Sequence, residues 1–171
     1  MRTARVMVLP SDRAWKEAFE AIKEEIERAV GDLVISIEHV GSTSVEGLSA
    51  KPCIDIDVVI EDYGVFGEVV CRLADIGYFH EGDLGIPDRE AFCYTAKPHL
   101  MTHHLYVCPR HSRELHRHIT FRDFLRSHPE AVKQYGAVKE EAARLFPNDI
   151  EGYIAHKTPW IEELYRQCGL I

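Results

Sequence analysis

The sequence lacks the marks of several protein classes. Its 171 residues contain no apolar run close to the ~20 residues that a membrane-spanning helix requires. Segment 1–15 holds no apolar stretch of secretory length, so we expect a cytoplasmic protein with no membrane partner. No repeat, low-complexity tract or linker divides the chain, whose length suits a single domain with a substantial core.

Basic residues are outnumbered by acidic ones. The chain has 20 lysines and arginines against 28 aspartates and glutamates, which gives a formal net charge of -8 at pH 7. A dedicated nucleic-acid-binding protein needs a basic surface that neutralises phosphates. We therefore expect no nucleic-acid partner, although a small basic pocket is compatible with this charge.

Closely spaced cysteine pairs are also absent. The 5 cysteines are scattered and include no C-x-x-C pair, so the sequence lacks the commonest zinc-binding and redox motifs. Cys53, Cys93 and Cys108 lie in apolar, strand-like runs. We expect all three to be small buried thiols of a protein that works in a reducing compartment.

The most informative stretch that is present is VGSTSVEGLSAKPCIDIDV, residues 40–58. Asp55 and Asp57 stand two apart in an apolar run, so both side chains point to one side of a predicted strand. Two neighbouring carboxylates repel each other and are costly to bury, and a metal cation is the usual remedy. The Gly41-Ser42 turn upstream offers backbone N–H groups and a hydroxyl to phosphate oxygens. The pattern predicts a site for metal-bound phosphates.

The residue types of this stretch also predict which side chains bind the cation and which bind the phosphates. The hard carboxylate oxygens of Asp55 and Asp57 favour Mg²⁺ or Mn²⁺ as the cation. Ser42 and Thr43 are candidates to hold the β- and γ-phosphates of a nucleotide. Lys51 either supplies positive charge to the leaving phosphates or is an ordinary surface lysine.

Three further candidates lie downstream. Arg89 stands between two acids just before a predicted strand, where it is either part of a solvated charge cluster or a bidentate phosphate contact. His104 and Tyr106 share one face of the next predicted strand, over 103–107, and are candidates to line the pocket. The predicted site therefore draws on segments that are far apart in the chain.

Histidines are concentrated in one stretch, since six of the ten fall between His99 and His118. They show no sharp metal-binding spacing such as H-E-x-x-H, so exposed or hydrogen-bonded histidines are the favoured interpretation. The alternative is a partial zinc site made by His99 with His103, or by His104 with Cys108. Alternation along the predicted strand places His103 and His104 on opposite faces of the sheet.

Two tyrosine–lysine pairs occur in the last third of the chain. Tyr135 precedes Lys139 and Tyr153 precedes Lys157 by four residues, so each pair shares one face of a predicted helix. The favoured interpretation is a packed ring beside a solvated amine. The alternative is a nucleotide platform in which the tyrosine stacks on a base and the lysine binds phosphate.

Hydrophobic periodicity predicts a mixed α/β (α+β) fold. We expect a mixed core over about 1–108 and a helical part over about 109–171, within one domain. The two strands that flank the glycine-rich connection are expected to pair antiparallel, and Pro159 to kink or delay the last helix. The expected helices cover 13–30, 63–76, 112–127, 129–146 and 150–167, and the expected strands cover 33–40, 53–60, 78–80, 90–95 and 103–107.

The stretch at 40–58 resembles the nucleotidyltransferase signature of the DNA polymerase β-like superfamily. In that signature an apolar residue, Gly, and Gly or Ser precede Asp, an apolar residue, Asp or Glu, and a second apolar residue. The longer string HVGSTSV, followed by GL and AKP, resembles the GrpB family of predicted nucleotidyltransferases more specifically. Landmarks on both sides extend this resemblance along nearly the whole chain, with Trp15 before the stretch and Arg89, Phe92, Tyr135, Lys139, Tyr153 and Lys157 after it.

This resemblance implies a nucleotidyltransferase-like fold, a small mixed sheet flanked by helices and followed by C-terminal helices. It implies a metal-dependent enzyme that moves a nucleoside monophosphate from a nucleoside triphosphate to an acceptor, with Asp55 and Asp57 as catalytic metal ligands. It also favours a phosphate or substrate contact for Arg89. The implied partner is a nucleotide or another phosphorylated small molecule, and the implied cofactor is Mg²⁺ or Mn²⁺.

One position departs from the pattern of the superfamily. Active members usually supply a third carboxylate from a later strand, whereas 103–107 reads HHLYV and contains no acid. We do not favour Glu90, at the start of the preceding strand, as its substitute. The chain is then either an enzyme with altered metal ligands or a non-catalytic module that binds a nucleotide or phosphorylated small molecule. A zinc-dependent hydrolase built on the histidine-rich stretch is the least favoured alternative.

Overall fold

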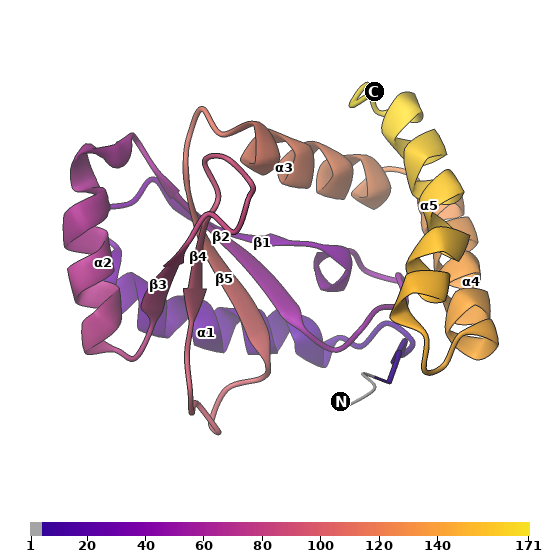
Figure 1. The fold of residues 1–171 in the computed structure, drawn as a ribbon, viewed down its shortest axis with the longest axis horizontal. Helices are drawn as coiled ribbons and strands as arrows, with labels where there is room; N and C mark the ends of the chain where they lie inside the picture. The colour runs from indigo at the N-terminus through magenta and orange to yellow at the C-terminus, as the bar shows by residue number, and fades with distance from the viewer. Residues whose placement is uncertain (1–4) are drawn as a thin grey trace.

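The computed structural model describes residues 5–171 as a mixed sheet with helices around it (Figure 1). The helices are α1 (Ala14–Val30), α2 (Phe66–Asp75), α3 (Arg113–Arg126), α4 (Pro129–Leu145) and α5 (Ile150–Gln167), with 3₁₀ turns at η1 (Ser42–Ser44) and η2 (Tyr63–Val65). The strands are β1 (Ser36–Val40), β2 (Ile54–Ile60), β3 (Phe79–Gly82), β4 (Glu90–Cys93) and β5 (His103–Pro109). No helix in this range combines the length and apolar character needed to cross a bilayer.

The strands form one sheet in the order β1-β2-β5-β4-β3. β1 pairs antiparallel with β2, as the sequence predicts, β2 pairs parallel with β5, and β4 pairs antiparallel with both β5 and β3. The parallel register sets Asp55 opposite His104 and Asp57 opposite Tyr106. Side chains of paired residues share a face, so these four side chains lie on the same side of the sheet.

The opposite face of the sheet carries the main hydrophobic core. Helices α1 and α2 pack there, and Figure 1 shows α1 running behind the strands. The even positions of β2 point into this core because side chains alternate along a strand, and they are fully buried. Burial of each such isoleucine contributes roughly 1.5–3 kcal/mol. Residues that join helices and sheet in this core include Phe19, Ile22, Ile26, Ile54, Ile56 and Val69.

The acid-bearing face is partly covered by α3, while α4 and α5 lie to the side of the sheet and pack on the loop after η1 (Figure 1). Helix α3 packs over the far end of β2 and β5, where Val59, Cys108 and Leu115 form a small apolar cluster. Another cluster joins the loop after η1 to the C-terminal helices, with Leu48 against Tyr135 among its members. This packing holds the η1 turn against helices that come from the other end of the chain.

The predicted helices and strands are present, with shifted ends. The strand expected over 33–40 begins only at Ser36. The helix expected over 63–76 opens with the η2 turn, where the Asp62 carboxylate accepts a hydrogen bond from Gly64 N–H. Pro159 lies inside α5 and does not delay the start of that helix.

The cysteines follow the prediction in two of three positions. Cys53 and Cys108 are buried, whereas Cys93 is exposed. Cys93 is the last residue of β4, and alternation turns its side chain away from that of Phe92, which lies in the main core. The prediction of burial was therefore wrong for Cys93.

Candidate functional site

Asp55 and Asp57 leave the same face of β2 but meet different surroundings. The Asp55 side chain is 34% exposed, whereas Asp57 is 0% exposed. The isoleucines at the neighbouring even positions point the other way, into the core. We call this polar face around Asp55 and Asp57 the acidic notch. It is open at Asp55 and closed at Asp57.

The Gly41-Ser42 turn lies directly against Asp55. Gly41 has φ 74° and ψ -177°, a conformation that is essentially restricted to glycine. A Cβ atom added to Gly41 would lie 2.3 Å from Asp55 Oδ2, so a side chain there would displace the carboxylate. The structure therefore brings the turn and the first aspartate into contact.

Lys139 of α4 reaches the same turn. Its Nζ donates to Ser42 Oγ at 2.5 Å and to the Ser49 carbonyl at 3.0 Å, and lies 4.7 Å from the Tyr135 ring centroid. The residue is only 4% exposed, and this burial, together with the charge of Lys157, lowers the pKa of Lys139 to about 7. The prediction of a solvated amine was wrong for Lys139, because α4 packs onto the loop after η1.

Contacts from β1, α1 and α3 fix the rest of the η1 turn. Thr43 is buried, and its hydroxyl pairs with His39 Nε2 at 2.9 Å. The His39 ring stacks on Phe19 of α1, and burial lowers its pKa to about 4. Arg126 of α3 donates two hydrogen bonds to the Ser44 carbonyl. These contacts lock the turn from the side of α1 and α3.

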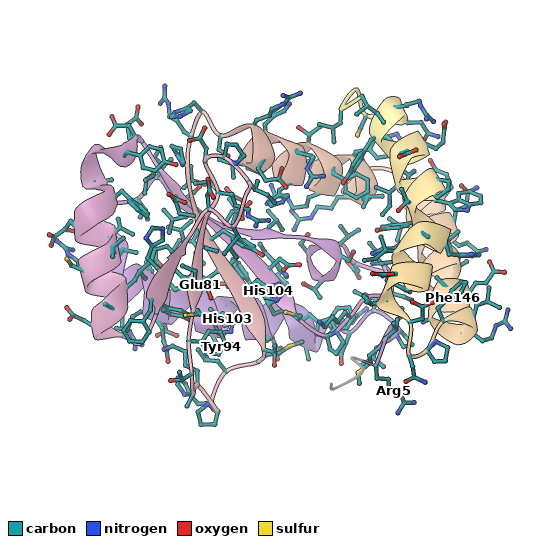
Figure 2. The ribbon with its side chains drawn as sticks, in the orientation of Figure 1. Arg5, Glu81, Tyr94, His103, His104 and Phe146 are labelled. Atoms are coloured by element: carbon teal, nitrogen blue, oxygen red, sulfur yellow. The ribbon has the colours of Figure 1, made fainter. Side chains whose placement is uncertain are left out.

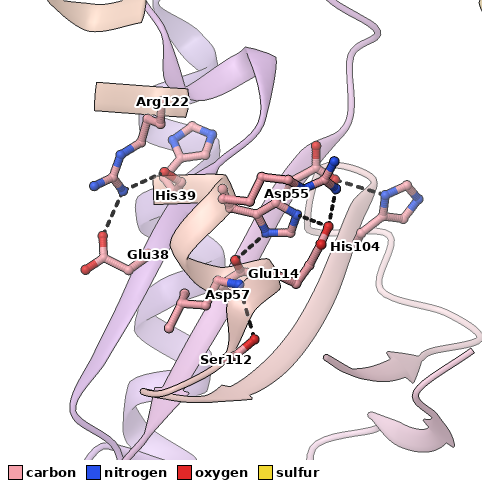
Figure 3. A network of polar contacts seen from close by, with 11 residues as sticks. Glu38, His39, Asp55, Asp57, His104, Ser112, Glu114 and Arg122 are labelled. Carbon is pink, nitrogen blue, oxygen red and sulfur yellow. Dashed lines mark hydrogen bonds and ion pairs between the residues drawn. The ribbon is translucent and has the colours of Figure 1, made fainter. Parts of the chain in front are cut away.

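Asp57 is held by a polar network from α3 (Figure 3). Its Oδ2 pairs with His118 Nδ1 at 2.6 Å, and His118 Nε2 pairs with Glu114 Oε1 at 3.1 Å. Burial raises the pKa of Asp57. Burial alone would lower the pKa of His118, but its bond to Asp57 and the nearby acidic charges raise it overall. The pair therefore holds its proton firmly, while Asp57 Oδ1 is buried with no hydrogen-bond partner within residues 5–171.

Asp55 is contacted from β5 by His104. Nδ1 of this exposed imidazole lies 3.0 Å from Asp55 Oδ1 (Figure 3). Hydrogen bonds to Asp55 and to Cys53 raise the pKa of His104 to about 10. The donor atoms of Cys53, Asp55 and His104 all lie within 4.8 Å of one another. The residue predicted to line the pocket is thus a direct partner of the first aspartate.

Tyr106 and Arg89 form a wall on the β4 side of the notch. The Arg89 guanidinium carbon lies 4.4 Å from the Tyr106 ring centroid, and Arg89 Nε is buried with no hydrogen-bond partner in the described part of the chain. Burial raises the pKa of the half-buried Tyr106. Lys51 is exposed on the segment that leads into β2.

Other residues that the sequence offered for a zinc site in the histidine-rich stretch, His99 to His118, have separate partners. His103 is buried and pairs with the Tyr78 hydroxyl at 2.7 Å. His103 and His104 are consecutive on β5 (Figure 2), and alternation places their side chains on opposite faces of the sheet. His99 pairs with a glutamate of α1. Cys108 lies in the apolar cluster under α3. The structure therefore gives His104 the neighbours Cys53 and Asp55 and not the predicted Cys108.

A cavity of about 1230 Å³ lies behind the turn and not at the acids. The start of α1, the η1 turn and α4 surround it, and neither aspartate borders it. Its lining mixes acidic and basic side chains, so its charge does not select one class of ligand. The lining residues include Lys16, Glu17, His39, Arg126, Lys133 and Glu140.

Two residues that contact the acids carry no distinctive sequence signal. His118 reaches Asp57 because α3 crosses the sheet, and nothing near position 118 indicates that crossing. Glu114 and His118 are four apart and so share one helix face, but this spacing does not indicate that His118 contacts Asp57. Cys53 has the apolar surroundings of a packing residue, and only the register of β5 places it beside an imidazole.

Comparison with known proteins gives a consistent family assignment. Residues 5–167 match the model of a family described as GrpB protein. Glutamate-rich protein GrpB of Alkalihalophilus pseudofirmus is 32% identical over 167 residues, which cover 95% of this chain and 95% of that protein. UPF0157 protein YqkA of Bacillus subtilis is 31% identical over 158 residues, which cover 92% of this chain and 46% of that protein.

A further relative carries the name of an enzyme. A dephospho-CoA kinase of Mycolicibacterium paratuberculosis is 29% identical over an aligned length of 188 positions. The alignment covers 96% of this chain and 46% of that protein. The chain thus spans about half the length of this kinase and of YqkA.

Solved structures confirm the predicted nucleotidyltransferase-like fold. The crystal structure of the conserved protein GrpB from Enterococcus faecalis has a TM-score of 0.81 and 29% identity, and the match covers 95% of this chain and 96% of that chain. A Cid1 poly(U) polymerase bound to MgATP has a TM-score of 0.57 over 80% of this chain and 44% of that chain. At 9% identity, the second likeness concerns the fold alone.

Proposed function

The chain belongs to the GrpB family, and we propose that it binds a nucleoside triphosphate with a divalent cation and transfers the nucleoside monophosphate to an acceptor. The observation that carries this proposal is the contact between Gly41 and Asp55. This contact sets a phosphate-binding turn against a carboxylate, and a metal-bound triphosphate requires both, since the cation and the anion bind together.

The phosphates bind at the turn. Gly41 has no side chain, so a phosphate approaches its backbone closely. Ser42 Oγ and Lys139 Nζ, 2.5 Å apart, supply a hydroxyl and an amine. A bound phosphate favours the charged amine and offsets the effect of burial on its pKa. Arg89, with its unpartnered Nε, supplies a second positive group from the wall above Tyr106.

Thr43 and Lys51 have lesser roles in this proposal. The Thr43 hydroxyl is committed to His39, so Thr43 contributes its backbone N–H and holds the turn in place. Lys51 is an exposed charge on the approach to β2, where it attracts the anionic ligand.

The two acids fit one divalent cation. Asp57 Oδ1 is a buried carboxylate oxygen without a hydrogen-bond partner in residues 5–171, which is unusual unless a ligand completes the site. Asp55 and Asp57 would hold one Mg²⁺ or Mn²⁺, which on binding neutralises phosphate charge and stabilises the attacking and leaving oxygens. β5 adds no third carboxylate, because His104 and Tyr106 occupy the facing positions.

The remaining contribution of the protein is orientation. His118 pins one oxygen of Asp57, so the other oxygen has a fixed direction. The turn is locked by Arg126 and by the pair of Thr43 with His39, so the phosphates meet a rigid surface. Positioning of this kind and neutralisation of charge are the main sources of catalysis expected for phosphoryl and nucleotidyl transfer.

Release of pyrophosphate tests the transfer. The full chain is incubated with Mg²⁺ and each of ATP, CTP, GTP and UTP, with a fractionated small-molecule extract as the source of acceptor. We expect release with at least one nucleotide, and a rate lower by about 100-fold in Asp55→Asn, the scale for loss of one strong electrostatic contact. Asp75→Asn, at an exposed acid that ends α2, is the matched control. Full activity in both Asp55→Asn and Asp57→Asn would exclude this mechanism.

A binding module is the second candidate, and the missing third carboxylate favours it. β5 presents an imidazole and a phenol to the notch, and one oxygen of Asp57 is already committed to His118. Because one relative is named dephospho-CoA kinase, coenzyme A precursors join the nucleotides as candidate ligands. Isothermal titration with these compounds and Mg²⁺ separates the two candidates. Tight binding without pyrophosphate release supports the module, and release excludes it.

A further inference from the structure

We propose that Cys53, Asp55 and His104 form a binding site for a transition-metal cation of the Zn²⁺ class. Their donor atoms, one sulfur, one carboxylate oxygen and one imidazole nitrogen, all lie within 4.8 Å of one another. The proposal does not depend on nucleotidyl transfer, because the site consists of these three side chains whether or not a nucleotide binds beside them.

The donors stand close to the spacing that a tetrahedral ion requires. Metal–ligand bonds of about 2.0–2.3 Å put the ligand atoms of a tetrahedral zinc site roughly 3.3–3.8 Å apart. His104 Nδ1 and Asp55 Oδ1 are 3.0 Å apart, and Cys53 Sγ lies within 4.8 Å of a donor atom of each. An ion takes the place of the hydrogen that joins the imidazole to the carboxylate, and the donor–donor distances need to change by about 1 Å or less to reach the tetrahedral spacing.

The scaffold of the site is rigid. Asp55 and His104 are directly opposite each other on β2 and β5, which are neighbours at the centre of the sheet. Cys53 immediately precedes β2 and is 5% exposed, so packing restricts its side chain. Gly41 closes the opposite side, because its backbone lies against Asp55 Oδ2. A metal site on paired central strands holds its ligands more precisely than one on loops.

The donor set selects the metal. Mg²⁺ prefers oxygen ligands and keeps several waters, whereas thiolate and imidazole favour Zn²⁺ and its neighbours among the transition metals. Asp57 is not a member of this three-donor group, and its Oδ1 belongs to the cation site of the proposed function. Cys53, Asp55 and His104 together therefore favour Zn²⁺ over Mg²⁺ by ligand type, and Asp55 is common to this site and to the cation site of the proposed function.

The site is also open on one side. The side chains of Asp55 and His104 are 34% and 53% exposed, so the solvent side carries no protein ligand from β2 or β5. Three protein donors leave a fourth tetrahedral position to a water molecule or to an oxygen of a bound ligand. Zinc sites with this composition are the ones that act on ligands, whereas structural sites are closed by four protein donors.

Cobalt titration tests the site, since Co²⁺ reports thiolate ligation and geometry by its absorption spectrum. Metal-free full-length protein is titrated with Co²⁺ under anaerobic, reducing conditions. We expect one equivalent to bind, with a near-ultraviolet thiolate-to-cobalt charge-transfer band and visible bands of tetrahedral intensity. Zn²⁺ should abolish the spectrum at one equivalent, and a large excess of Mg²⁺ should leave it unchanged.

Two variants and two controls assign the ligands. Cys53→Ser should lose the charge-transfer band. His104→Gln should keep that band and bind Co²⁺ at least about 10-fold more weakly, the lower limit seen even for residues that only support a ligand. Cys71→Ser and Cys93→Ser alter exposed cysteines outside the site and should match the parent protein.

Circular dichroism and thermal midpoints establish that each variant is folded. Should Cys53→Ser fail to fold, His104→Gln alone decides, because His104 is exposed. The proposal is overturned if stoichiometric Co²⁺ gives no charge-transfer band, if the band survives in Cys53→Ser, or if His104→Gln binds Co²⁺ as the parent does. No nucleotide enters this experiment, so its failure leaves the transferase proposal to be judged by pyrophosphate release.

Discussion

Asp55 and Asp57 extend from one face of β2, and the fold gives the two carboxylates opposite environments. Asp55 is one-third exposed, lies against the Gly41 backbone and pairs with the exposed His104. Asp57 is fully buried under α3 and pairs with His118. A single helix that crosses the sheet thus separates an accessible end of the notch from an enclosed end.

The difference in exposure shows that one strand carries a carboxylate held rigidly by burial and another that is accessible to ligands. At the enclosed end, burial and a histidine partner give a carboxylate a fixed direction, and its removal is costly. At the open end, a carboxylate that is one-third exposed and has an exposed imidazole partner is accessible to ligands, and its loss costs the fold little. Four substitutions test the comparison, from the largest expected effect to the smallest.

The largest effect is expected at the enclosed end. His118→Ala leaves Asp57 buried and unpaired, so we expect the free energy of unfolding to fall by about 3–5 kcal/mol. Urea unfolding monitored by circular dichroism measures it. His116→Ala, an exposed histidine on the same helix, should change it by less than about 0.5 kcal/mol. Equal values for the two variants would mean that the buried pair does not hold Asp57.

The second effect is the pH dependence of stability caused by Lys139, the buried lysine that contacts the turn beside Asp55. An unfolded lysine keeps its proton up to a pKa of about 10.4, whereas the pKa of buried Lys139 is lowered to about 7. Between these values the unfolded state binds more protons, so the free energy of unfolding rises with pH, by roughly 1.4 kcal/mol per unit.

Lys139→Met removes this titration. Urea unfolding at pH 7 and pH 9 should show that the parent gains roughly 2–3 kcal/mol relative to the variant. Lys133→Met, at an exposed position on the same helix, is the control and should follow the parent. Parallel curves for the parent and Lys139→Met would show that the amine beside Ser42 is not strongly desolvated.

The third effect tests the close approach of the turn. Gly41→Ala forces a side chain into a glycine-only conformation and against Asp55, so we expect a loss of about 1–3 kcal/mol in the free energy of unfolding. Gly67→Ala is the matched control, because an added Cβ there meets nothing within 4 Å and α2 gains a better helix former. A Gly41→Ala protein as stable as Gly67→Ala would refute the contact with Asp55.

The smallest effect is expected for Asp55 itself. Asp55→Asn removes a partly exposed pair with His104, so the free energy of unfolding should change by no more than about 1 kcal/mol, while ligand binding is lost. Thermal unfolding of Asp55→Asn beside Asp57→Asn measures the contrast directly. A larger loss of stability in Asp55→Asn than in Asp57→Asn would reverse the assignment of the two ends.

The parts of the site that the sequence predicts are those set by nearby residues. Alternation along β2 puts Asp55 and Asp57 on one face. Antiparallel pairing sets Val40, the last residue of β1, opposite Asp55, so Gly41 lies beside that carboxylate. The parts of the site that the sequence does not predict are contacts between residues far apart in the chain. Lys139 is 97 residues from Ser42, and His118 is 61 residues from Asp57. Nothing local distinguishes either side chain from a solvated one.

The sequence by itself determined the order of helices and strands, the family, and the pairing of a glycine turn with two acids. The order and the pairing follow from periodicity and spacing, which act over a few residues. The family follows from the resemblance of the stretch around residues 39–58 to the GrpB motif. Only the tertiary structure decided which acid is buried, which lysine reaches the turn, and that Cys53 and His104 share Asp55. The register of β5 and the crossing of α3 set those contacts, and both depend on how distant segments pack around one core.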